Sequence, residues 1–371
     1  MTHRNPLREL NAHGQSVWLD NLSRSLIENG DLGRLIERDG ISGITSNPAI
    51  FAAAIAGSGA YDDQIRDFAR GAGDTIALYE ALAIDDIRAA ADLLRPSFER
   101  NSGTDGFVSL EVNPHLARDT QGTLAEAERL WRAVDRNNAL IKIPGNPEGV
   151  PAIEEALYRG ININVTLLFS LEAYEQVMHA HQRALERRLA DGLPLAGIFS
   201  VASFFLSRID SMVDERLDAL DGAQAAALRG QTAVASAKCA YRRWQKLYSG
   251  ARWDRLAQAG AQVQKPLWAS TSTKDPSYPD TKYVEPLVGR QTVNTMPEVT
   301  IDAFRDHGRA VPDSIAQGVD EAAQVPARLA GLGIELDKVT AALVEEGIVK
   351  FQQPFDRLLN NLGEKRAAFA A

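Results

Sequence analysis

The chain has 371 residues, of which 45% are hydrophobic and 24% are charged, and its formal net charge is −9. This composition is typical of a globular protein with enough apolar surface for a large core, so it excludes a disordered chain and a small disulfide-stapled scaffold. The acidic balance argues against a general nucleic-acid-binding protein, but an anionic small substrate is not excluded, because its site needs only a few local cations.

Cysteine usage and the amino-terminal residues indicate the compartment. Cys239 is the only cysteine, which excludes an internal disulfide and a metal site built from several cysteines. Residues 1–15 have no apolar core of signal-peptide length, and no window approaches about 20 uninterrupted apolar residues. We therefore expect a cytoplasmic protein that makes no membrane contact.

Taken in chain order, short β-branched or apolar runs alternate with longer stretches of helical periodicity. Eight such runs are found, at residues 16–20, 43–46, 107–112, 139–144, 161–166, 197–203, 266–270 and 292–295. Helices are expected between them, for example over residues 123–135 and over residues 171–191, where apolar side chains recur at helical spacing. Strands that alternate with helices predict βα units around a parallel sheet.

Eight βα units predict an α/β fold, the (β/α)8 TIM barrel, which normally takes about 250 residues. The surplus is expected as additional helices before the first strand, between strands 6 and 7 (about 206–264) and at the C-terminus (from about 312). A doubly wound open sheet is the rival fold, but neither G-x-G-x-x-G nor a Walker motif occurs. Because no linker separates independent parts, we expect one domain over residues 1–371.

In such a barrel the chemistry lies at the carboxyl ends of the strands. Polar side chains lie at seven of these ends, and the candidates are Asp20, Thr45, Asn47, Glu111, Lys142, Asn164, Thr166, Ser203, Arg208, Ser270, Ser272 and Lys274. Successive strand residues point to opposite sides, so Lys142 is expected to point into the barrel mouth while Ile141 and Ile143 face the helices. The same alternation places Glu111 on one side with Ser109.

A lysine between apolar neighbours in a strand has a specific chemical use. Desolvation disfavours the ammonium form, so the amine of Lys142 can attack a ketone and form a Schiff base, which allows carbon–carbon cleavage without a metal. Asp20 and Glu111 would then move the protons. Each residue also has a structural alternative. Lys142 could extend its ammonium group to solvent or form a buried ion pair with Glu111. Asp20 could cap a strand end or a helix, and Asn47 could form a turn before Pro48.

Two segments are candidates for phosphate binding. Arg208 lies five residues after Ser203, although a helix-surface arginine is the alternative. Residues 269–274 read Ala-Ser-Thr-Ser-Thr-Lys, and small hydroxyl side chains after strand 7 let backbone N–H groups approach an oxyanion. Lys274 would add positive charge, and the alternative for this segment is a solvated loop.

The histidines and the cysteine do not predict a metal site or a nucleophile. His179 and His181 are two residues apart on a predicted helix and cannot share a face, and no H-E-x-x-H motif occurs. Cys239 lies in a helical run and is expected to fill the core, and G-x-S-x-G is absent. We expect no metal and no cofactor.

Six stretches carry a resemblance to a known family. They are GITSNPAIF (43–51), LIKIPGNPEG (140–149), GININVTLLFS (160–170), SVASFFLSRID (200–210), WASTSTKDPSY (268–278) and VNTMPEVTIDAF (293–304). In this order and spacing the chain resembles the transaldolases of the pentose phosphate pathway, of the longer bacterial type, from about residue 17 to the C-terminus. The resemblance implies a metal-independent enzyme on a (β/α)8 barrel. It would transfer a dihydroxyacetone unit from sedoheptulose 7-phosphate or fructose 6-phosphate to glyceraldehyde 3-phosphate or erythrose 4-phosphate.

The resemblance also implies roles for individual residues. Lys142 resembles the Schiff-base lysine, Asp20 the acid/base of the carbon–carbon step, and Glu111 with Thr166 the holder of the catalytic water. The substrate-binding residues implied are Thr45, Asn47, Asn164, Ser203, Phe205, Arg208, Ser270 and Ser272. Shorter transaldolases have an arginine soon after the serine of strand 7, whereas this chain has Lys274, which we infer to be the second phosphate cation.

The same residues are compatible with three other functions. A fructose 6-phosphate aldolase would release the three-carbon unit, although small aldolases of that type are much shorter chains. A non-catalytic sugar-phosphate-binding barrel would keep Lys142 and Glu111 as an ion pair, and a pyridoxal phosphate enzyme would also need an inward lysine. Phe369 could close the mouth of the barrel. The oligomeric state and the acceptor preference are not predicted.

Overall fold

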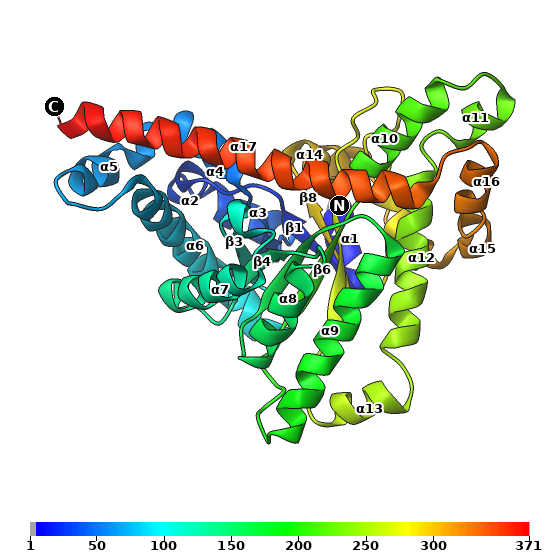
Figure 1. Ribbon diagram of the computed structural model, residues 1–371, viewed down its shortest axis with the longest axis horizontal. Helices are drawn as coiled ribbons and strands as arrows, with labels where there is room; N and C mark the ends of the chain where they lie inside the picture. The colour runs from blue at the N-terminus through cyan, green and yellow to red at the C-terminus, as the bar shows by residue number, and fades with distance from the viewer. Residues whose placement is uncertain (1–4, 371) are drawn as a thin grey trace.

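A computed structural model describes residues 5–370, except for the side chain of Ala370; residues 1–4 and 371, which the predicted domain includes, lie outside the described residues. Its centre is a closed barrel of parallel strands in sequence order (Figure 1). The strands are β1 (Gln15–Leu19), β2 (Gly43–Ile44), β3 (Phe107–Glu111), β4 (Ala139–Pro144), β5 (Ile163–Leu168), β6 (Ser200–Phe205), β7 (Gln264–Ala269) and β8 (Thr292–Met296). The predicted (β/α)8 barrel is confirmed.

Several strand bounds differ from the predicted ones for local reasons. Strand β5 continues past Thr166 to Leu168. Its register with β6 shifts between Val165 and Leu168, where Leu167 has φ 59°, and this irregularity changes the direction of the strand. Strand β6 begins at Ser200, three residues later than predicted, since Gly197 has φ 85°. Strand β7 begins at Gln264, and Pro266 lies within it.

Helices surround the barrel and form the predicted additions. The α-helices before β6 are α1 (Pro6–Ala12), α2 (Arg24–Glu28), α3 (Asp31–Asp39), α4 (Pro48–Ala56), α5 (Asp62–Ala69), α6 (Thr75–Arg100), α7 (Thr120–Val134), α8 (Gly149–Tyr158) and α9 (Leu171–Ala190). Those after β6 are α10 (Ser207–Asp218), α11 (Ala223–Leu228), α12 (Thr232–Leu247), α13 (Ala251–Gln258), α14 (Glu298–His307), α15 (Val319–Ala322), α16 (Val325–Gly331) and α17 (Leu336–Ala370). Short 3-10 turns include η1 (Gly59–Tyr61), η2 (Pro114–Leu116), η3 (Glu285–Leu287) and η4 (Ser314–Ala316).

The barrel interior changes from apolar to polar along its axis. On β3 the inward side chains are Phe107, Ser109 and Glu111, since alternate residues share a face. The ring of Phe107 stacks on that of Phe199 with centroids 4.1 Å apart, which fills the amino-terminal end. Ser109 and Glu111 follow toward the carboxyl end, so the polar side chains collect at the mouth, as the strand alternation predicts.

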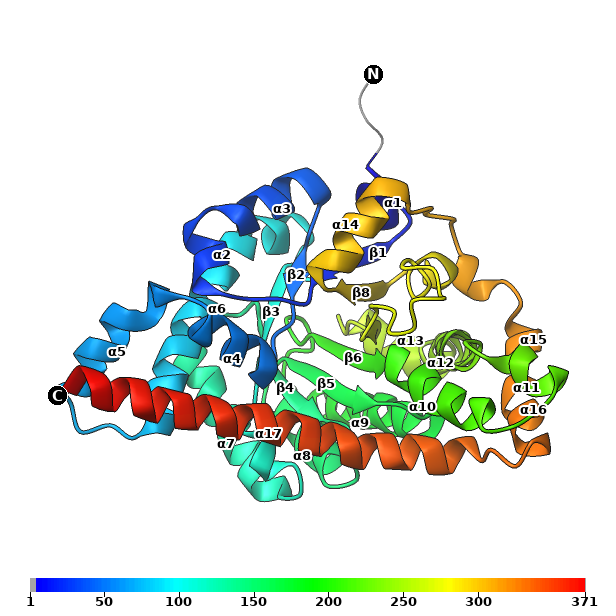
Figure 2. The same ribbon diagram turned by 90° about the horizontal axis from the view of Figure 1, so that it is seen from above.

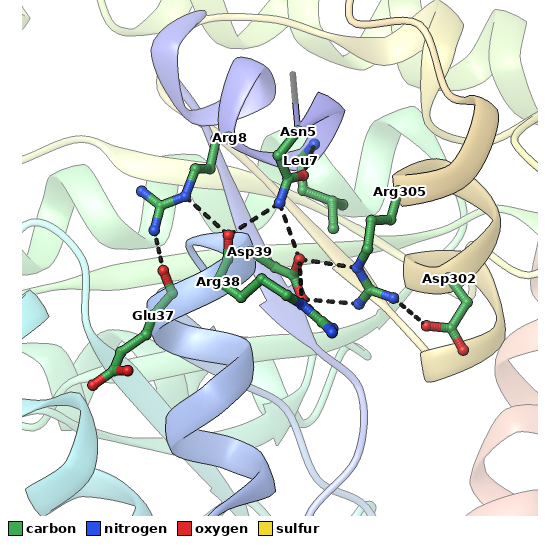
Figure 3. A network of polar contacts seen from close by, with 8 residues as sticks. All are labelled: Asn5, Leu7, Arg8, Glu37, Arg38, Asp39, Asp302 and Arg305. Atoms are coloured by element: carbon green, nitrogen blue, oxygen red, sulfur yellow. Dashed lines mark hydrogen bonds and ion pairs between the residues drawn. The ribbon is translucent and has the colours of Figure 1, made fainter. Parts of the chain in front are cut away.

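A buried carboxylate joins helices from the two ends of the chain (Figure 3). Asp39, at the end of α3, is fully buried and accepts hydrogen bonds from Nε and Nη2 of Arg305 in α14, at 2.9 and 2.8 Å. Arg38 and the Nδ2 atom of Asn5, which caps α1, also donate to it. This network ties the amino-terminal helix to the helix that follows β8.

The C-terminal helix α17 runs across the barrel for 35 residues (Figures 1 and 2). It packs against α4, α5, α6 and α10 and against strand β5. The expectation that Phe369 closes the mouth is wrong, because its ring lies under the guanidinium of Arg66 on α5, at 4.8 Å. Phe351, more than four turns earlier, is the residue of α17 at the mouth. Among the described residues, no helix is long and apolar enough to cross a membrane.

Candidate active site

Lys142 on β4 is a buried amine in the mouth of the barrel, with 5% of its surface exposed. Its Nζ atom donates a hydrogen bond to the backbone oxygen of Ser46 at 3.1 Å and lies 3.8 Å from Oε1 of Glu111. The strand register explains this arrangement, because Lys142 is paired with Glu111 on β3 and with Asn164 on β5. The three side chains therefore form one row across neighbouring strands.

Glu111 is a buried carboxyl group with an unusual proton affinity. Burial raises the pKa of Glu111 to about 7, the charge of Lys142 opposes this rise, and the nearby carboxylate of Asp20 adds to it. Neither carboxyl oxygen has a hydrogen-bond partner among the described residues, and the 3.8 Å to Lys142 is too long for a hydrogen bond. The carboxyl can therefore take up or release a proton near neutral pH.

Asp20 follows β1 and is held by hydroxyl groups at the mouth. Thr45 donates a hydrogen bond to its Oδ1 at 2.7 Å, and Thr45 also contacts the hydroxyl of Thr295 on β8 at 2.7 Å. Burial raises the pKa of Asp20, while the Thr45 hydrogen bond and the charge of Lys142 lower it in part. A carboxylate with a raised pKa is a stronger base than an ordinary aspartate.

An amide and two hydroxyls make a second fixed group beside the lysine. Asn164 donates from Nδ2 to the hydroxyl of Ser109 at 2.9 Å and accepts at Oδ1 from the hydroxyl of Ser203 at 2.7 Å. Both Asn164 and Ser203 are buried. These bonds fix the orientation of the amide and use the proton of the Ser203 hydroxyl, so the oxygen of that hydroxyl remains to accept a hydrogen bond from a ligand.

A cavity of about 250 Å³ lies above these groups. Its walls are Asp20, Thr45, Asn47, Lys142, Ser203, Phe205, Arg208, Ala269, Ser270, Thr271, Ser272, Lys274, Thr295, Pro297 and Phe351. Asn47 lines it although its Oδ1 also caps α4 by accepting from the amides of Ala49 and Ile50. Asn47 therefore lines the cavity and also caps a helix, whereas the predicted alternative for this residue was a turn before Pro48.

Two cations and a turn with a left-handed residue lie at the side of this cavity. The guanidinium of Arg208 on α10 lies over the ring of Phe205 at 5.3 Å, and its Nη1 is buried without a hydrogen-bond partner among the described residues. Lys274 donates to the hydroxyl of Ser272 at 2.7 Å. Ser270 has φ 55°, and its hydroxyl meets that of Ser207 at 2.8 Å, which fixes the end of β7 against the start of α10.

Three predicted residues are not part of the cavity wall. Glu111 lies behind Lys142 and Asn164 lies behind Ser203, each in contact with the wall residue that it supports. Thr166 on β5 is fully buried, and its hydroxyl has no hydrogen-bond partner among the described residues. The contact between Thr166 and Glu111 that the predicted water-holding pair would use is therefore not among the hydrogen bonds of the site.

Three residues of the cavity wall are neither predicted site residues nor part of the predicted 269–274 segment, and they are Thr295, Pro297 and Phe351. Thr295 ends the eighth predicted strand, and this position is the signal that marks it. Phe351 lies on α17, 209 residues after Lys142, and its ring centroid is 5.4 Å from Nζ of Lys142. No local pattern in the sequence marks it. Among the described residues, no group of three or more histidine, cysteine, aspartate or glutamate side chains could hold a metal ion.

Comparison with known proteins gives a consistent assignment. The model of the transaldolase/fructose-6-phosphate aldolase family matches residues 17–362. Proteins named transaldolase from Parafrankia sp. (strain EAN1pec) and from Thiobacillus denitrificans are 47% and 48% identical to this chain, over 366 and 359 residues. These alignments cover 99% and 97% of the chain and 99% and 100% of the relatives. A transaldolase from Thermobifida fusca is 47% identical over 363 residues, covering 98% of the chain and 99% of the relative. The chain therefore belongs to the transaldolase/fructose-6-phosphate aldolase family, and its full-length relatives place it among the transaldolases.

Proposed function

We propose that this enzyme transfers a dihydroxyacetone unit from a ketose phosphate to an aldose phosphate through a Schiff base on Lys142. The donor is sedoheptulose 7-phosphate or fructose 6-phosphate, and the acceptor is glyceraldehyde 3-phosphate or erythrose 4-phosphate. The observation that carries the proposal is the buried amine of Lys142, which faces one cavity together with Asp20 and Arg208 and has Glu111 at 3.8 Å. The reaction takes place in the cytoplasm, a location that single-cysteine usage supports.

The first half of the reaction follows from these groups. The amine of Lys142 adds to the C2 carbonyl of the donor, and loss of water from the carbinolamine gives an iminium ion. Asp20 takes the proton of the C4 hydroxyl, the C3–C4 bond breaks, and its electron pair flows to the iminium nitrogen. The aldose phosphate leaves and an enamine of dihydroxyacetone remains on Lys142. Glu111, with a pKa of about 7, exchanges the protons of the water lost and gained.

The remaining polar residues bind the substrate. Thr45, Asn47, Asn164 and Ser203 would bind the hydroxyl groups of the three-carbon unit. Arg208 and Lys274 would bind the phosphate together with the hydroxyls of Ser270 and Ser272, because a doubly charged anion needs cations and hydrogen-bond donors together. Arg208 is partly exposed and Lys274 is exposed, which suits a phosphate that enters and leaves with each turnover.

Borohydride trapping tests the proposal. The purified protein is reduced in the presence of fructose 6-phosphate, and its intact mass and peptide map are measured. We expect a three-carbon adduct on Lys142, and a Lys142→Ala variant with no adduct and at least about a thousandfold less transfer. An adduct on another lysine would refute the role of Lys142, and the absence of any adduct on folded protein would refute the Schiff base.

A fructose 6-phosphate aldolase is the second candidate, favoured by the family description, which includes both activities. The two functions share every step up to the enamine. They differ in whether that enamine reacts with an aldehyde or with a proton. Adding erythrose 4-phosphate to the reaction without borohydride, and measuring sedoheptulose 7-phosphate against free dihydroxyacetone, decides between them.

A further inference from the structure

Helix α17 contributes an apolar side chain to a cavity that is otherwise mostly polar. The ring of Phe351 lies 5.4 Å from Nζ of Lys142, and 6% of the residue is exposed. The other aromatic side chain in the wall is Phe205, which belongs to the barrel itself, whereas Phe351 reaches the site from the helix that crosses the mouth. The lysine and the phenylalanine cover one another, since each is nearly excluded from solvent.

The position of Phe351 is fixed from both sides along α17. One residue later, Gln352 donates to the backbone oxygen of Pro114 at 3.3 Å, and Asp356 contacts His115 at 2.7 Å. One and a half turns earlier, Glu345 pairs with Arg118. All three partners lie in the segment that follows Glu111 on β3, so the helix is attached to the same connection that begins at the catalytic site.

A glycine allows α17 to approach strand β5 closely. A Cβ atom at Gly347 would lie 2.9 Å from Cδ2 of Leu167, the residue with φ 59° directly after Thr166. Any side chain at position 347 would therefore press on Leu167 or move the helix outward. The helix is packed on the mouth over one turn from Gly347 to Phe351, which is the spacing at which two residues share a helix face.

The position of Phe351 beside Lys142 bears on the fate of the enamine that the proposed reaction forms. The enamine on Lys142 has two fates, and both begin with attack by its nucleophilic carbon, which was C3 of the donor. In transfer, this carbon bonds to the aldehyde carbon of the acceptor, and the aldehyde oxygen takes a proton. In release, the same carbon takes a proton, water adds to C2 of the resulting iminium, and dihydroxyacetone leaves with the free amine restored.

We propose that Phe351 is a specificity-determining residue that shields the enamine on Lys142 from water and so favours transfer over release. This inference rests on the proposed function. An apolar ring over the amine removes solvent from the side on which the enamine carbon would be protonated. The face of the ring also attracts the positive charge of the iminium that precedes cleavage.

The test compares two rates in the same preparation. One is the steady-state release of dihydroxyacetone from fructose 6-phosphate without acceptor, and the other is transfer with erythrose 4-phosphate present. In Phe351→Ala we expect the ratio of release to transfer to rise at least roughly tenfold. Phe351→Leu keeps bulk and loses the ring, so a smaller rise is expected. Leu362→Ala removes a fully buried side chain from the same helix away from the cavity, and its ratio should equal that of the unchanged protein.

The outcomes separate the inference from the proposed function. A ratio in Phe351→Ala within about twofold of the unchanged protein overturns the inference alone. An equal rise in Leu362→Ala also overturns it, because the effect would then come from loosening the helix. If Phe351→Ala does not fold, Phe351→Leu decides in the same way. An unchanged protein that forms no lysine adduct and transfers nothing overturns the proposed function.

Discussion

The amine of Lys142 is close enough to the carboxyl of Glu111 for its charge to affect the protonation of that carboxyl. At 3.8 Å in a buried site, the ammonium of the lysine favours the carboxylate, while burial favours the neutral acid. Burial has the larger effect, and the pKa of Glu111 rises to about 7. A buried acid that titrates near neutral pH can serve in both directions of proton transfer, which the formation and the hydrolysis of a Schiff base require in turn.

A Glu111→Gln variant tests this role through the pH dependence of activity. In the unchanged protein, the carboxylate form that accepts a proton from water increases as pH rises through about 7, so kcat/KM should rise over that interval and then level off. Glutamine cannot accept the proton, so the variant should lose about a hundredfold in kcat and show no inflection near pH 7. Rates measured from pH 5 to 9, a range of about two units on either side of the inflection, check this expectation.

An exposed glutamate supplies the control for that experiment. Glu335→Gln removes a carboxyl that is 61% exposed and pairs with Lys338, and the pH profile should keep its inflection. If Glu111→Gln retained the inflection, another group would titrate there. No histidine is among the residues that line the cavity, so histidine is not the obvious substitute.

At the residue scale the sequence predicted a large part of the candidate site. Ten of the thirteen proposed residues line one cavity, because strand alternation and the position at a strand end determine where a side chain points. Thr166 is the residue whose position strand alternation predicts least well. The irregularity after Val165 changes the direction of β5, and alternation alone does not predict such a bulge. Phe351 could not be predicted, since its contact with Lys142 depends on the path of a distant helix.

At the scale of single elements, the ends of helices α1, α3 and α14 meet at one buried carboxylate. Burial alone would raise the pKa of Asp39, but hydrogen bonds from Arg38, Arg305 and Asn5 outweigh it and lower the pKa below the usual 3.8. A lowered pKa means that this interaction stabilises the folded state above pH 3.8 and that the stabilisation is lost as pH falls through the folded-state pKa. The network should therefore contribute most to the free energy of unfolding at neutral pH.

Asp39→Asn should lower the free energy of unfolding by about 2–3 kcal/mol at pH 7, because two arginine side chains lose their charged partner. The difference in the free energy of unfolding between the variant and the unchanged protein should begin to decrease below about pH 5, because the carboxyl of Asp39 becomes protonated in the unfolded state. Urea unfolding at several pH values measures both quantities. Asp302→Asn is the matched control, since it removes the other carboxylate on Arg305, which is 69% exposed, and should cost less than about 1 kcal/mol. Equal losses in the two variants would contradict the argument.

The elements themselves were predicted better than their contacts. Helices α7 and α9 lie within a few residues of the predicted 123–135 and 171–191, because their apolar periodicity is strong. Helix α17 was predicted as part of a helical tail, yet its apolar face does not say which surface it covers. The misplaced expectation for Phe369 has this cause. The ring packs on Arg66 because α17 extends past the mouth to α5.

At the scale of the whole molecule, the additions to the barrel share its core. Helix α17 buries Phe355, Leu358 and Leu362, and it contacts helices from the first quarter of the chain as well as α10 after β6. The connection between strands 6 and 7 packs through Trp244, whose indole N–H donates to the backbone oxygen of Gln264 at the start of β7. Unfolding one of these helices alone would expose apolar surface both on the helix and on the barrel, which costs free energy.

We therefore expect the predicted single domain to unfold in one cooperative transition. Trp18 and Trp268, both fully buried in strands, report on the barrel through their fluorescence once the other three tryptophans, which lie in helices α7, α12 and α13, are replaced by phenylalanine. Far-UV circular dichroism is dominated by the helices outside the barrel. Because the additions and the barrel share one core, the two signals should change at the same temperature and at the same urea concentration. A loss of helical signal that precedes the tryptophan change would mean that α17 or the connection between strands 6 and 7 forms a separate unit. In that case α17 could move Phe351 away from Lys142 while the barrel stays folded. The ratio of release to transfer would then rise with temperature below the main transition.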